Sequence, residues 1–284
     1  MYRNIYYLPE ESLDDLCAVL KEDDILVDRA SLPLKREKGT IYVCDSEDYS
    51  AKVAIQLGES NIKYRFATPE GELIFLHNDA LCEFYSGFSF RYYADRNATY
   101  TDGDFNIDDT ADMDLLEEER AAEVRRVVTA FLERGSSGFD QQDKLDIVTE
   151  IARVYEKEGV YYAECVRTID GLDITGNRVV CVVKDGKVAE ALGTWCFLTL
   201  GESYSAQLTD ILNILFSVKK EIDRIRTSEG ICQVKVESVG RCYTLHYLGD
   251  DDGFCFIPCW QIATDIHGEF IYNAVDGTLY TNNP

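Results

Sequence analysis

The chain has 284 residues, of which 46% are hydrophobic, and this length permits one large domain or two ordinary domains with well-formed cores. Its formal net charge of −24 excludes a nucleic-acid-binding protein and a polybasic contact with an anionic membrane, because both need clustered Lys and Arg. A basic protein partner remains compatible. No apolar run reaches the ~20 residues of a membrane-spanning helix, and residues 1–7 lack the apolar core of a signal peptide, so the sequence predicts a soluble protein.

The first hundred residues predict a helix followed by an antiparallel meander. Residues 9–22 begin with Pro9 and two acidic residues, and their leucines recur at helical spacing. Residues 40–93 then predict a series of short strands, because turn signals at 58–61 and 69–72 separate runs that favour extended structure.

A polar and acidic segment, residues 94–112, is the best candidate for a linker or long loop. Asp112 is a suitable N-cap for the next predicted helix, residues 113–134, whose apolar residues repeat at helical spacing. Acidic residues at the start of this helix and Arg134 at its end match the helix dipole.

The second half of the chain alternates strands with one helix. Residues 144–200 predict three consecutive strands, with a turn at 158–159, a longer connection that begins at 170–171, and a strong hairpin signal at 184–187. A helix is expected at 205–225, with Ser205 as its N-cap. The expected strands after this helix span residues 231–248, 253–264, 269–275 and 278–281.

These elements predict an α+β fold class with two modules, each an antiparallel sheet with helices packed on one face. The expected N-terminal module spans residues 1–110 and the expected C-terminal module spans residues 111–284. The boundary is placed in the polar segment because few core contacts are expected there.

The ten cysteines lie mostly inside apolar runs, and no CxxC pair occurs. Cysteine in such runs behaves as a small hydrophobic residue, so we expect buried thiols and a reducing or anoxic environment. The predicted hairpins bring Cys165 near Cys181 and Cys242 near Cys259. Either pair can form a disulfide, although reduced and packed thiols are the more common state.

The histidines give no clear metal or catalytic site. His77, His246 and His267 lie far apart in the sequence, and we expect each at the surface or in a turn. Cys255, Cys259 and His267 suggest a zinc site, but strand residues four positions apart are separated by ~13 Å, which is too far to share one ion.

Asp102, Asp104, Asn106 and Asp108 alternate as do the first ligands of a calcium-binding loop. However, Ile107 occupies the position of the turn glycine, and Met113 occupies that of the bidentate glutamate. Motifs for hydrolases, zinc proteases and phosphate-binding loops are also absent from the sequence. We therefore expect no catalytic residue, no cofactor and no metal.

Residues 113–284 carry several weak motifs in a fixed order. They are a helix at 117–132, an Asp-Gly turn at Asp170 and Gly171 with Ile174, a strand segment from Arg178 to Trp195, a helix after residues 203–205, a Pro-x-Trp-x-Ile strand (Pro258, Trp260, Ile262), and a Tyr-Asn-Ala-x-x-Gly ending (Tyr272, Asn273, Ala274, Gly277). In this order they resemble the extracytoplasmic modules of YycH/YycI-type regulatory proteins, which are partners of a Gram-positive sensor histidine kinase. PepSY-type modules are similar in their combination of a helix and a meander.

The resemblance implies a non-enzymatic regulator that contacts a membrane sensor kinase or a paralogous regulator. It implies a location on the extracytoplasmic face of the membrane if the natural protein has an N-terminal anchor, which this chain lacks; the alternative location is cytoplasmic. The binding surface would be a sheet face or an exposed edge strand. The structural or interface candidates are Trp195, Pro258, Trp260, Tyr272 and Asn273, with core packing the first expectation for both tryptophans.

Two other functions stay open. The first is a PepSY-type peptidase inhibitor or cell-envelope-binding module. The second is a thiol hydrolase, for which the sequence offers no nucleophile–base signature.

Overall fold

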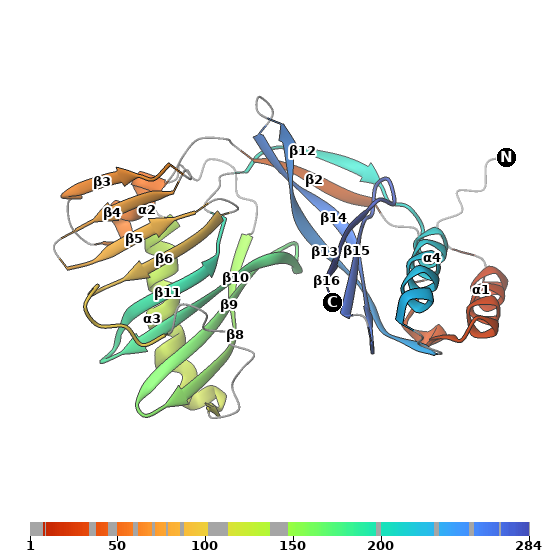
Figure 1. Cartoon of the computed structure of the whole chain (residues 1–284), viewed down its shortest axis with the longest axis horizontal. Helices are drawn as coiled ribbons and strands as arrows, with labels where there is room; N and C mark the ends of the chain where they lie inside the picture. The colour runs from red at the N-terminus through yellow and green to blue at the C-terminus, as the bar shows by residue number, and fades with distance from the viewer. Residues whose placement is uncertain are drawn as a thin grey trace. The chain divides into compact units, whose positions relative to one another are not determined.

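Figure 1 shows the computed structural model of the chain, and contacts between Cα atoms group it into two compact units. Unit 1 combines Met1–Val43 with Gly201–Pro284, and unit 2 is Cys44–Leu200. The sequence placed a boundary at residue 110 instead. The structure describes residues 8, 10–33, 38–44, 50–58, 62–69, 72–77, 79–85, 88–101, 113–136, 147–196, 200–229, 233–249, 253–266 and 268–283.

Unit 1 is built from both ends of the chain. Its elements are α1 (Glu10–Glu22), β1 (Ile25–Val27), the 3₁₀ turn η1 (Arg29–Ser31), β2 (Lys38–Cys44), β12 (Leu200–Gln207), α4 (Ile211–Glu229), β13 (Val234–Gly249), β14 (Gly253–Thr264), β15 (Gly268–Asn273) and β16 (Leu279–Asn283). The long antiparallel hairpin β13–β14 is central, because β14 also pairs with β2 and β15, and β1 adds to β13 in the parallel direction.

The core of unit 1 lies between its two helices and this sheet. Helix α1 buries Leu13, Leu16 and Leu20, which recur at the three- and four-residue spacing of one helix face. These leucines pack in one cluster with the apolar stripe of α4 and with Trp260 and Phe270 of the sheet. The helix predicted at 9–22 is therefore confirmed over its described residues.

Helix α4 begins later than the sequence predicted. Residues 205–207 belong to β12, so Ser205 is not the N-cap. Asp210 takes that place, and its carboxylate accepts a hydrogen bond from the Asn213 N–H at 3.5 Å.

Unit 2 contains α2 (Ser50–Leu57), β3 (Tyr64–Ala67), β4 (Leu73–Leu76), β5 (Leu81–Phe84), β6 (Ser89–Tyr93), β7 (Asp114–Leu115), α3 (Glu118–Ser136), β8 (Ile147–Lys157), β9 (Val160–Ile169), β10 (Leu172–Lys184) and β11 (Lys187–Thr194). The strands pair in the order β7-β8-β9-β10-β11-β6-β5-β4-β3, and each of these pairs is antiparallel.

Side chains alternate across the sheet of unit 2. Phe75, Cys82, Phe90 and Cys181 are buried in one cluster with Phe131 of α3 and with residues of α2. The strand predictions missed α2 within residues 40–93. They counted three strands in 144–200, where the structure has β8, β9, β10 and β11, followed by the start of β12.

The turns predicted at 158–159 and 184–187 are confirmed, whereas residues 170–171 form a tight turn in place of the longer connection expected to begin there; the turns predicted at 58–61 and 69–72 lie partly outside the described residues. Asp170–Gly171 and Asp185–Gly186 both place two successive residues at positive φ, between 50° and 73°. This is the backbone of a tight hairpin turn, and glycine adopts it without steric cost.

The expected fold class is wrong. Among the described residues, 52% are in strands and 27% in helices, with sixteen strands and only four α-helices. The sheet of unit 1 is also mixed, because β1 runs parallel to β13. The picture of helices packed on two antiparallel modules fails because the long strands of residues 147–207 and 234–283 dominate the structure, and because β1 joins a strand far away in the sequence.

Candidate functional site

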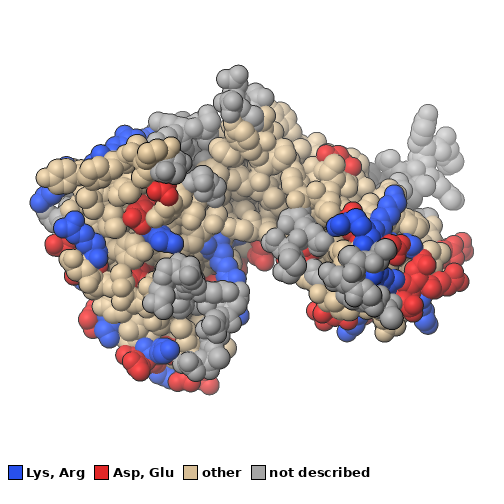
Figure 2. Space-filling model, in the orientation of Figure 1, with Lys and Arg blue, Asp and Glu red and all other residues tan. Residues whose placement is uncertain are grey.

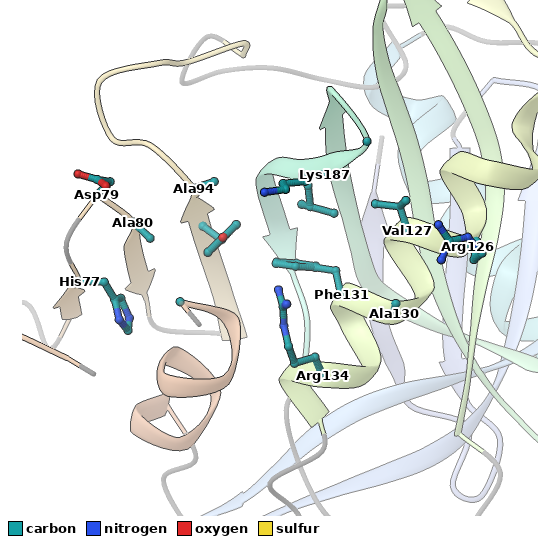
Figure 3. A pocket seen from close by; sticks show the side chains of 14 residues that line it. His77, Asp79, Ala80, Ala94, Arg126, Val127, Ala130, Phe131, Arg134 and Lys187 are labelled. Atoms are coloured by element: carbon teal, nitrogen blue, oxygen red, sulfur yellow. The ribbon is translucent and has the colours of Figure 1, made fainter. Parts of the chain in front are cut away.

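The candidate functional site is a hollow of about 540 Å³ in unit 2, which we call the cationic cavity (Figure 3). It lies between α3, the connection from β4 to β5, the end of β6 and the start of β11. Its lining consists of Gly58, His77, Asp79, Ala80, Tyr92, Ala94, Arg126, Val127, Ala130, Phe131, Arg134, Gly186, Lys187 and Val188.

Helix α3 supplies one wall through its spacing. Arg126, Ala130 and Arg134 are four residues apart and so form one stripe along the helix, with Phe131 beside it. The Arg134 guanidinium lies over the Phe131 ring at 5.6 Å from its centroid, and the Tyr92 ring centroid is 4.9 Å from that of Phe131. The wall therefore combines a cation with an aromatic surface.

The hairpin between β10 and β11 supplies the cation opposite this stripe. Lys184 and Lys187 face each other across the turn, but only Lys187 lines the cavity. In Figure 3 the Lys187 amine and the Arg134 guanidinium lie on either side of the Phe131 ring. Lys187 makes no ion pair with any residue that the structure describes.

The far wall is formed by His77, which is only 3% exposed, although the sequence predicted it at the surface or in a turn. Its backbone N–H donates to the Ala80 carbonyl at 3.0 Å in the connection between β4 and β5. A Cβ atom at Gly58 would overlap the His77 ring, so a side chain at residue 58 would displace that ring. The position of this wall therefore depends on a glycine.

The electrostatics of the cavity oppose those of the whole chain. Arg126, Arg134 and Lys187 bring three positive charges, whereas Asp79 is the single acidic residue of the described lining. Arg126 is partly neutralised by Glu123, at 2.6 Å, and both side chains of that pair are well exposed. The excess of positive charge in the described lining suits it to holding an anion.

The sequence did not identify this cavity. Its only local signal is the eight-residue spacing of Arg126 and Arg134 on one predicted helix. His77 and Lys187 come from other parts of the chain, and only the folded sheet brings them to that helix.

The five residues selected from the sequence lie elsewhere. Trp260 and Tyr272 face each other on β14 and β15 and are buried in the core of unit 1. Pro258, also buried, pairs with Tyr243, while Asn273 accepts a hydrogen bond from the Val275 N–H at 2.8 Å. Trp195 is 1% exposed in unit 2, where the Arg167 guanidinium lies 5.1 Å from its ring. The structure brings Trp260, Tyr272 and Asn273 together but places none of the five at the cavity.

The cysteines are packed thiols. Cys242 lies opposite Cys259, as the sequence suggested. Cys165 pairs with Val179 and is offset from Cys181 by two residues, but its thiol hydrogen-bonds with that of Cys181, so this pair is also close. No disulfide joins the described cysteines, and burial raises the pKa of several thiols, among them Cys165.

The metal patterns considered from the sequence receive no support within the described ranges, where no group of three His, Cys, Asp or Glu side chains could hold an ion. The alternating Asp and Asn residues at 102–108 and His267 lie outside those ranges.

A second surface is the sheet face that carries Tyr64 and Phe66, which we call the β3–β6 face. Cross-strand pairing aligns two rows on it: Tyr64, Leu76, Leu81 and Tyr93; and Phe66, Ile74, Glu83 and Arg91. All eight side chains are partly or fully exposed, and Tyr64 and Phe66 are 62% and 50% exposed. Over β3 the surface in Figure 2 is mainly uncharged.

No family model matches this chain, and no curated protein matches it. It is similar to the crystal structure of an uncharacterized protein from Eubacterium rectale, with a TM-score of 0.45 and 10% identity over 97% of this chain and 99% of that chain. At this TM-score the likeness carries no argument about function. None of the described helices has the length and apolar character needed to cross a membrane.

Proposed function

We propose that the protein is a non-enzymatic interaction protein that binds a partner protein through the β3–β6 face. The observation that carries this proposal is the pair Tyr64 and Phe66 on β3. Their rings stack with centroids 6.4 Å apart while at least half of each side chain stays exposed. Large aromatic side chains dominate protein interfaces because they bury much apolar surface at a small cost in conformational entropy.

The partner that fits this face is a protein with an apolar patch on a basic surface. The two rows contain six apolar or aromatic residues and one residue of each charge, Glu83 and Arg91, so contact there buries mainly apolar area. The chain as a whole carries a net charge of −24, which attracts a basic partner over long range and raises the association rate.

The finer version of the proposal, in which the partner is a membrane sensor kinase or a paralogous regulator, is supported only by the order of sequence motifs given above. It requires the natural protein to lie on the extracytoplasmic side of the membrane. Protease treatment of intact protoplasts tests this requirement: digestion of the full-length gene product from outside is expected, and a protected cytosolic protein would rule out the finer version.

The partner itself is tested by site-specific photo-crosslinking in living cells. A photoreactive phenylalanine replaces Tyr64, and in the matched control it replaces Tyr204 of unit 1, which is 52% exposed. We expect one defined protein to cross-link from position 64 and not from 204, and F66S to weaken that product. A sensor kinase as the product supports the finer version, and a wall peptidase supports the PepSY-type alternative. If positions 64 and 204 give the same products, the proposed function is wrong.

A further inference from the structure

We propose that the cationic cavity of unit 2 binds a small organic anion. Its carboxylate or phosphate group would lie near Lys187 and Arg134, and its apolar body would lie against Phe131. This inference concerns a different surface from the β3–β6 face, because the cavity lies on the side of the sheet that packs against α3. A result that contradicts the proposed function would therefore not contradict this inference, and the reverse also holds.

The positive charge of the lining favours a negatively charged ligand. Three cations and one carboxylate line a hollow in a chain whose net charge is −24, so positive charge is concentrated there against the overall composition. Lys187 contributes most directly, because its ammonium makes no ion pair with a described residue and an anion would supply its missing partner. Arg134 adds a planar donor fork of the kind that recognises carboxylate and phosphate.

The apolar residues of the lining favour a ligand that also has an apolar portion. Val127 and Ala130 present carbon surface between the cations, over the buried Phe131 and Val188, and Ala130 leaves space that a larger residue would fill. A volume of about 540 Å³ falls within the range of small-molecule sites, whereas an inorganic anion alone would leave most of it to water. The structure therefore favours an anion attached to an aromatic or aliphatic group.

The walls are held in place before any ligand arrives. The tight turn at Asp185–Gly186 fixes Lys187 at the first position of β11, and the Arg134 side chain is supported by the Phe131 ring. Opposite them, Gly58 allows the buried His77 ring to approach the end of α2. A site with preformed walls loses less entropy when a ligand binds.

The test uses the full chain and 8-anilinonaphthalene-1-sulfonate, a fluorescent organic anion with an aromatic body. We expect saturable fluorescence at one site per chain, with displacement by benzoate and hexanoate at lower concentrations than by inorganic phosphate. K187Q and R134Q are each expected to weaken dye binding about tenfold. A130W should also weaken it about tenfold while keeping every charge, because the indole occupies the cavity.

Matched controls separate the cavity from the general loss of charge. K184Q removes the other lysine of the same hairpin turn, and R120Q removes an exposed arginine of the same helix; both should leave dye affinity unchanged. Circular dichroism and the urea midpoint establish that each variant is folded. Equal dye affinity in K187Q, R134Q and their controls would overturn the inference, as would the absence of saturable binding to the native chain.

Discussion

Cys242 lies directly opposite Cys259 across the β13–β14 hairpin, and both thiols are fully buried. They pack with Ile271 in a small apolar cluster next to Tyr280. A hydrogen bond with Cys242, followed by burial, raises the pKa of the Cys259 thiol above its ordinary value. Protonated thiols are weak nucleophiles, so the role of this pair is to fill space in the apolar core. The packing of the sheet requires both thiols to stay neutral.

We predict that the protein loses stability at alkaline pH because of such thiols. Burial raises the pKa of Cys82 and of Cys196 from 9.0 to about 12. Between these values the unfolded chain releases protons that the native protein retains, so the free energy of unfolding falls as pH rises from 9 toward 12. Below the unfolded pKa this contribution to stability is fully present.

Urea unfolding at a series of pH values checks this prediction. Each of the two thiols is expected to contribute a slope of up to about 1.4 kcal/mol per pH unit. The C82A/C196A variant should therefore show a flatter decline than the native protein. An equal decline in both proteins would assign the alkaline sensitivity to other groups.

The two tryptophans are predicted to respond differently to replacement by phenylalanine. The Trp260 indole N–H donates to the Thr209 carbonyl at 2.9 Å, whereas the buried Trp195 indole N–H has no hydrogen-bond partner among the described residues. Both variants lose packing, but W260F also leaves a carbonyl without its donor. We expect W260F to cost about 1 kcal/mol more than W195F in equilibrium unfolding. Equal losses would mean that packing alone decides both cases.

Two glycines of unit 1 are predicted to differ in their tolerance of alanine. Gly277 has φ of +80° in the turn after β15, while Gly240 has ordinary strand φ, and a methyl group added there would meet no atom within 4 Å. G277A should lower the free energy of unfolding by about 1 kcal/mol because L-residues disfavour this φ. G240A is expected to be neutral or slightly stabilising. If thermal unfolding shows the two variants to be alike, the turn does not need its left-handed residue.

Glu164 is predicted to be important for the stability of unit 2. Its buried carboxylate forms ion pairs with Arg153 at 2.5 Å and with Arg178 at 2.6 Å, and so links β8, β9 and β10. E164Q should cost about 2 kcal/mol, since it removes the buried negative charge to which both guanidinium groups bind. The control E123Q removes one acid of an exposed pair on α3 and should not change the urea midpoint measurably. Equal effects of the two substitutions would contradict this role.

Elements with a strong local signal were predictable from the sequence. The α3 and α4 regions follow helical spacing, and the Asp185–Gly186 turn follows from its residue types. The Cys242–Cys259 register could be predicted because both residues lie at similar distances from the same turn. Helix α2 could not be predicted, because Ser50–Leu57 is only eight residues long and contains β-branched residues that also favour strands.

Long-range relationships were beyond local reasoning. The parallel pairing of Ile25 with Val234 joins segments from opposite ends of the chain, and no local pattern indicates it. The cationic cavity could not be predicted for the same reason, because His77, Arg134 and Lys187 come from separate parts of the chain. The resemblance to known regulators used motifs of residues 113–284, whereas both candidate surfaces include residues that precede this region.

Because unit 1 is built from both ends of the chain, unit 2 can fold before unit 1 during synthesis. All of unit 2 has left the ribosome once residues just beyond Leu200 have been translated and extruded, whereas unit 1 must wait for β13 to β16 before its sheet can form. Until then, α1 and β1 expose apolar residues such as Leu16 and Ile25 that are buried in the finished protein. The apolar residues of the N-terminal segment therefore stay exposed for longer during synthesis than those of unit 2.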